Sequence, residues 1–161
     1  MKNLFNLSLL VTVSFLTACG SGDSVAPVKQ GVFVDAPVEG LGFVTTSGLA
    51  GTTDANGIFN YLANDRVTFS LGSVNFPPVV AGGVVTPLDL VGASSANDPG
   101  ALSIARLLQS VDSDGNPDNG ITVNRSKLAS SISQPADWSK LNDVQLAAML
   151  SAGTAGLRSE S

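Results

Sequence analysis

The feature that most constrains the fold is a series of short apolar runs between residues 30 and 92, each separated from the next by turn-forming residues. Val67, Phe69 and Leu71 alternate with polar residues, so a β-strand here would place all three on one face. The Asp54–Gly57 segment supplies Asp and Asn side chains that bond the nearby backbone, and a glycine that accepts positive φ. Short strands with turns between them predict an antiparallel β-sandwich over 30–92.

Two stretches of this region carry a family resemblance. The sequence Gly-Val-Phe-Val-Asp-Ala-Pro-Val at 31–38 and the sequence Gly-Thr-Thr-Asp-Ala-Asn-Gly-Ile-Phe-Asn-Tyr at 51–61 resemble the carboxypeptidase-regulatory or transthyretin-like β-sandwich. The resemblance spans about residues 30–75. It implies an Ig-like or transthyretin-like antiparallel sandwich that carries no catalytic residues and serves as a spacer, a stabiliser or a binding surface.

The second half of the chain changes to helical spacing. Asp98 is expected to cap a helix with Pro99 at the first helical position, and apolar residues then recur every three or four positions for about 12 residues. Asn142 and Gln145 form a capping-box pattern that predicts a second helix, with Gly153 as its stop.

These patterns divide the chain into regions. We expect a β-sandwich over 30–92, a helical and acidic-loop extension over 93–153, and a disordered tail over 154–161. The fold class is therefore mainly β, an antiparallel sandwich with two appended α-helices (α+β overall).

The sharpest local feature is an acidic run in the extension. Asp112, Asp114, Asn116 and Asp118 place oxygen-bearing side chains at alternate positions, and calcium takes six to eight oxygen ligands at relaxed geometry. The run resembles the Asp-rich loops of EF-hand, dockerin and thrombospondin type-3 repeats, although Val123 stands where the EF-hand loop has a bidentate Glu. These four residues predict a weak calcium site; the alternative is a helix end that runs into a solvated turn.

Residues 1–18 have the layout of a secretory signal peptide, with a short positive start, an apolar stretch and small residues at the end. The apolar stretch is too short for a membrane-spanning helix, which needs about 20 apolar residues. Leu16-Thr17-Ala18-Cys19 resembles the bacterial lipobox, in which the cysteine receives lipid and the chain is cut just before it. The resemblance implies a diacylglycerol and an N-acyl chain on Cys19; the alternative is an ordinary signal peptide with an incidental cysteine.

Residues 19–29 are expected to form a lipidated flexible tether, because the segment after Cys19 is rich in glycine and serine. Several acyl chains anchor a protein stably, whereas a single chain binds membranes only marginally. In bacterial lipoproteins an Asp after the cysteine favours the inner membrane; Gly20 stands there instead, which implies the outer membrane. The periplasmic and surface faces of that membrane stay open as alternatives.

Composition excludes several classes of function. The chain has no histidine and one cysteine, so Ser-His-Asp and Cys-His mechanisms, His-ligated zinc sites and internal disulfides are excluded. A net charge of −5 without a Lys/Arg cluster argues against nucleic-acid binding, which depends on phosphate contacts. We therefore expect no enzymatic activity and no nucleic-acid partner.

The sequence thus predicts a lipid-anchored cell-envelope protein that acts as a non-catalytic surface-interaction or adhesion-type module, with calcium as a candidate stabiliser. Its expected partners are the membrane, through the lipid, and an unidentified protein or surface. Two alternatives remain at this point. One is a structural spacer, such as the N-terminal part of a larger exported protein, and the other is a small-molecule carrier with an apolar cleft between sheet and helices.

Overall fold

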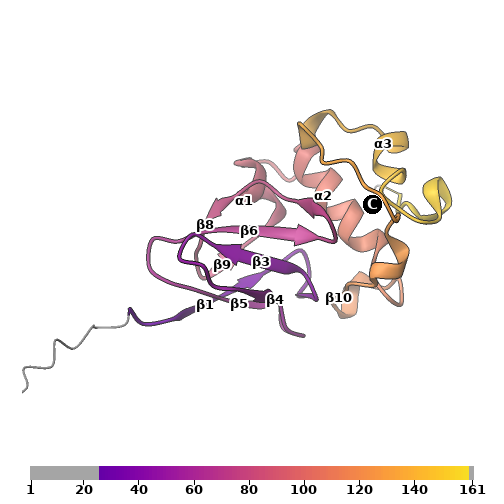
Figure 1. Cartoon of the computed structure of the whole chain (residues 1–161). Coiled ribbons are helices and arrows are strands. Elements are labelled where there is room, and N and C mark those ends of the chain that lie inside the picture. Colours follow the sequence, from indigo (N-terminus) through magenta and orange to yellow (C-terminus); the bar gives the residue numbers. More distant parts are fainter. Residues whose placement is uncertain (1–25, 160–161) are drawn as a thin grey trace, which may run out of the picture.

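The computed structural model describes residues 26–159, where a β-sandwich is joined at one end to a helical region (Figure 1). The strands are β1 (Lys29–Phe33), β2 (Val38–Glu39), β3 (Gly42–Thr45), β4 (Ala50–Thr52), β5 (Ile58–Tyr61), β6 (Arg66–Leu71), β7 (Val74–Asn75), β8 (Val79–Val80), β9 (Val84–Val85) and β10 (Ile121–Thr122). The helices are α1 (Pro87–Val91), α2 (Pro99–Ser110) and α3 (Asp143–Ala147), with 3-10 turns η1 (Pro117–Asn119), η2 (Arg125–Lys127), η3 (Trp138–Lys140) and η4 (Gly153–Gly156). The predicted fold class, mainly β with appended helices, is confirmed.

The strands form two larger sheets and one short pair. One sheet has the order β4-β3-β6-β7, with β8 also paired to β6, and all its pairings are antiparallel. In the other, β1 pairs antiparallel with β5 and parallel with β9. The short pair is parallel and joins β10 to β2, with Ile121 opposite Val38 and Thr122 opposite Glu39. This pair joins the chain that follows the acidic turn (residues 112–120) directly to the start of the sandwich.

The sandwich core is built around three phenylalanines from both larger sheets. Phe33 on β1 and Phe59 on β5 meet Phe69 on β6, with ring centroids 4.8 and 5.0 Å apart in edge-on arrangements. Such aromatic pairs contribute about 0.5–1.5 kcal/mol beyond their area burial. Val67 and Leu71 are buried beside Phe69, so the alternation predicted for this strand is confirmed.

Helix α2 begins where the sequence predicted. The Asp98 carboxylate accepts hydrogen bonds from the amides of Gly100 and Ala101 at 2.9 and 3.0 Å, and Pro99 takes the first helical position. The buried face of α2 closes the end of the sandwich, and η3 packs along α2. Trp138 of η3 is buried in the same core.

The second predicted helix is shorter than expected. Asn142 and Gln145 form the predicted capping box, but α3 ends well before Gly153. The reason is that the Met149 carbonyl turns to accept the Ala129 N–H at 2.8 Å, in a β-like contact that a continuing helix would prevent.

Helix α1 was not predicted and lies inside the region expected to be only β. The Thr86 N–H and hydroxyl donate to the Asp89 carboxylate at 2.8 and 2.7 Å, and the Thr86 hydroxyl accepts from the Asp89 N–H. This reciprocal capping, with Pro87 next to the cap, fixes a short helix that Gly92 ends at a φ of 67°.

The C-terminal segment differs from the disordered tail expected over 154–161. The Arg158 N–H donates to the Ser110 hydroxyl at 2.9 Å, and its guanidinium donates to the Gly115 carbonyl at 2.6 Å. The described part of this segment therefore packs against the end of α2. No helix within residues 26–159 is long and apolar enough to cross a membrane.

Candidate functional site

Two hollows in the helical end are candidate sites. A polar cavity of about 190 Å³ lies at the acidic turn after α2, and a larger groove of about 540 Å³ lies beside α3.

Asp112 is the most constrained residue of the acidic turn. It follows α2, forms an isolated β-bridge with Val123 and is only 1% exposed. Its Oδ1 accepts the Thr122 N–H at 2.9 Å, and its carbonyl accepts from the Lys127 ammonium. Its other carboxylate oxygen, Oδ2, is buried without a hydrogen-bond partner.

Asp114 lies beside Asp112 at the surface. One of its carboxylate oxygens accepts the Asn116 N–H at 2.8 Å, and the other accepts from the Asn119 side-chain amide at 2.9 Å. The Asn119 side chain, the Asn116 amide and contact with the Asp112 side chain together lower the pKa of Asp114. The Asp114 carboxyl is therefore held in its ionised form next to the buried Asp112.

The structure brings two of the four predicted calcium ligands to one cavity. Asp112 and Asp114 line it, whereas Asn116 and Asp118 do not. The Asn116 side chain instead caps η1, where its Oδ1 accepts the Asp118 N–H at 3.4 Å. Asn116 and Asp118 lie away from this cavity because the chain turns into η1 after Asp114, and calcium binding by any of the four residues stays a prediction.

Glu39 also lines this cavity, and sequence reasoning missed it. Its carboxylate accepts from the Thr122 hydroxyl at 3.2 Å. The pairing of β2 with β10 brings it there, and no local pattern links Glu39 to the acidic run. No group of three or more His, Cys, Asp or Glu side chains among the described residues is arranged to hold a metal ion. A cation here would therefore need neutral oxygens beside the carboxylates.

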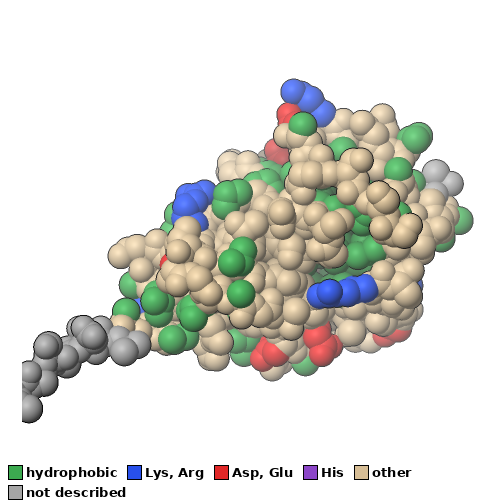
Figure 2. Space-filling model, viewed as in Figure 1, with side chains coloured by type: hydrophobic (Ala, Val, Ile, Leu, Met, Phe, Trp, Pro, Cys, Tyr) green, Lys and Arg blue, Asp and Glu red, His purple; other side chains and the backbone are tan. Residues whose placement is uncertain are grey.

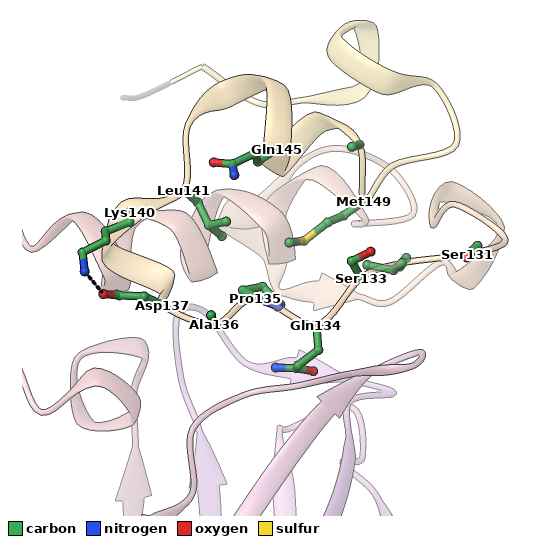
Figure 3. A pocket seen from close by; sticks show the side chains of 12 residues that line it. Ser131, Ser133, Gln134, Pro135, Ala136, Asp137, Lys140, Leu141, Gln145 and Met149 are labelled. Carbon is green, nitrogen blue, oxygen red and sulfur yellow. Dashed lines mark ion pairs between the residues drawn. The ribbon is translucent and has the colours of Figure 1, made fainter.

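The groove beside α3 has an apolar floor and a polar rim. Leu141 and Met149 point into it from the helical side, and Pro135 lies across from them on an extended segment (Figure 3). At one end of the rim the Lys140 ammonium pairs with the Asp137 carboxylate at 3.1 Å. The arrangement can take an apolar group of small-molecule size.

The Gln134 side chain fastens the extended wall of the groove to the sandwich. The Gln134 amide nitrogen donates to the Asn75 carbonyl at 2.7 Å, and its amide oxygen accepts the Asn75 N–H at 2.8 Å. Gln134 thereby pairs with the end of β7 as a neighbouring strand would.

Cys19, the predicted lipid attachment point, lies outside the described residues, as does the predicted signal peptide over 1–18. Comparison with protein-family models, curated proteins and solved structures found no match to this chain. The resemblance to transthyretin-like modules and to the lipobox therefore stays a prediction from the sequence.

Proposed function

We propose that this chain is a lipid-anchored cell-envelope protein whose folded part is a non-catalytic interaction module. The observation that carries the proposal is Leu16-Thr17-Ala18-Cys19 at the end of an apolar stretch, a short distance before the first strand. Lipid on Cys19 would hold the protein at a membrane, since two or more acyl chains anchor stably.

The placement of β1 supports this arrangement. The strand β1 is entered from the end of the sandwich far from α2 and α3 (Figure 1). A lipid on Cys19 would join the folded part of the chain on the side of β1, away from the groove beside α3.

The spacing of basic side chains on one face argues against a nucleic-acid partner. On the face in Figure 2, lysine and arginine side chains stand apart from one another, so this face has no basic patch. Binding of nucleic acid needs several phosphate contacts from such a patch.

The anchoring is tested by replacing the lipidated atom. In Cys19→Ser, which lacks the thiol, we expect the protein to leave the membrane fraction or to accumulate uncleaved. Ser21→Ala in the same segment serves as the matched control and keeps membrane retention. Membrane fractionation of cells expressing each variant decides the outcome, and full retention of Cys19→Ser would contradict the proposal.

A second candidate, a carrier of a small apolar ligand, is favoured by the groove beside α3. Leu141→Gln places an amide on its floor and is expected to weaken binding of a fluorescent polyene fatty acid about tenfold. Val144→Gln is the matched control, because Val144 lies on α3 but is 71% exposed and outside the groove. Fluorescence titration that finds no binding to the unmodified chain would reject this candidate.

A further inference from the structure

Two side-chain oxygens in the described residues are buried without a partner, Asp35 Oδ2 and Asp112 Oδ2. Burial raises the pKa of Asp35, against a hydrogen bond from Gln109 that lowers it, so that carboxyl is driven towards its neutral form. Asp112 has a second acid, Asp114, in contact with its side chain. A buried carboxylate oxygen without a partner lowers the stability of the fold. It therefore indicates that another group binds to this oxygen.

The group that completes Asp112 Oδ2 is either a proton shared with Asp114 or a bound cation. Two carboxylates in contact repel each other unless a proton or a cation lies between them. Within residues 26–159, the ion pairs Arg106–Asp143 and Lys140–Asp137 both lie away from this turn. The Lys127 ammonium is close, but it bonds the Asp112 carbonyl rather than either carboxylate.

The surrounding atoms select the kind of cation. The cavity wall offers oxygen atoms from carboxylates, hydroxyls and the backbone, with no thiol or imidazole to favour a softer metal. Hard oxygen sets of this kind suit calcium, which accepts irregular geometry and water among its ligands. Magnesium requires a near-ideal octahedron and releases its water reluctantly.

We propose that the cavity of about 190 Å³ at the end of α2 binds a calcium ion through the Asp112 and Asp114 carboxylates, with Glu39 adding negative charge from β2. Neutral oxygens and water complete the coordination. With so few carboxylates the affinity is weak, with a Kd of roughly 0.1–1 mM, as in extracellular modules. The ion joins the sandwich to its helical extension, and this site is independent of lipid attachment.

Thermal melting of the detergent-solubilised full chain tests the site. At about ten times Kd, calcium is expected to raise the Tm by roughly 5 °C over the chelator-treated protein, and magnesium to raise it less. A Tm that calcium does not change would overturn the proposal.

Asp112→Asn is the decisive variant because it keeps the fold. The Asn oxygen still accepts the Thr122 N–H, and the Asn amide takes the place of the partnerless oxygen and can donate to Asp114. We expect it to melt at or above the chelated parent and to lose the calcium response. Asp118→Asn, in the same turn but outside the cavity, is the matched control and keeps that response. Equal calcium shifts in both variants would overturn the assignment of Asp112.

Glu39→Gln removes the negative charge of Glu39 but keeps the shape of the side chain. The amide still accepts from the Thr122 hydroxyl, so the β2–β10 junction is preserved. We expect calcium affinity to fall several-fold without being lost, and an unchanged affinity would remove Glu39 from the site.

Discussion

Two buried aspartates, one in the sandwich and one at the helical end, have opposite environments. Asp65 is 4% exposed and Asp112 is 1% exposed. Asp65 accepts hydrogen bonds from the Thr46 hydroxyl, the Ser47 amide and hydroxyl, and the Leu62 amide, at 2.7 to 2.9 Å. Asp112 has one carboxylate oxygen bonded and the other without a partner.

The difference separates a carboxylate whose hydrogen bonds are complete from one with an oxygen left without a partner. Burial raises the pKa of Asp65, but its hydrogen bonds outweigh that effect and hold the pKa at about 2. These donors already satisfy Asp65, which ties the turn after β3 to the turn between β5 and β6. Asp112 lacks such a set, and we infer that a cation supplies it.

The largest effect is expected from Asp65→Ala, which leaves the Thr46, Ser47 and Leu62 donors without their acceptor. We expect the Tm, followed by circular dichroism, to fall by roughly 10 °C. Asp54→Ala is the control, because Asp54 also accepts backbone N–H groups but lies in an exposed turn. A fall no greater than that of Asp54→Ala would show that the Asp65 network contributes little.

The pH dependence of the Tm should follow the titration of Asp65. The folded-state pKa of Asp65, about 2, lies below the ordinary value of 3.8, so the unfolded chain binds more protons between these values. The contribution of Asp65 to the free energy of unfolding is therefore complete above about pH 5 and is lost as the pH falls towards 2. We expect the Tm gap between the parent and Asp65→Asn to narrow over that range. Asp137, whose pKa is also about 2, titrates in both proteins and cancels.

A smaller effect of opposite sign is expected at the other aspartate. In chelator, Asp112→Asn should raise the Tm by about 1–3 °C, because an amide replaces the partnerless oxygen. Asp65→Asn should lower the Tm, because the new amide faces N–H and O–H donors. Equal losses in the two variants would remove the distinction between the two sites.

The smallest effect is expected at the groove rim. The side chains of Lys140 and Asp137 are 81% and 42% exposed, and ion pairs in such positions contribute little. Lys140→Gln should change the Tm by less than about 2 °C. A larger loss would mean that this pair holds the groove wall in place.

Local patterns predicted the parts of the fold that depend on local chemistry. The two-residue period placed Val67, Phe69 and Leu71 in the core, and the Asp98–Pro99 pair located the start of α2. The start of α1 was equally local, since Thr86 and Asp89 form a capping box. It was missed because the apolar run before it favoured strands.

The candidate site could be predicted only in part, because half of it comes from a distant strand. Asp112 and Asp114 are close in sequence, but Glu39 reaches them through the parallel β2–β10 pair. Alternate spacing also suggested Asn116 and Asp118, which η1 takes away from the cavity. Alternate spacing places side chains on one side only in an extended loop, whereas this loop turns into η1.

The most direct test of the central claim is calcium binding measured by isothermal titration calorimetry on the chelator-stripped full chain and on Asp112→Asn. The account predicts about one calcium ion per chain in the parent, with a Kd of roughly 0.1–1 mM, and no binding to the variant. No calcium heat from the parent, or the same isotherm from Asp112→Asn, would contradict the claim that the buried Asp112 is a cation ligand.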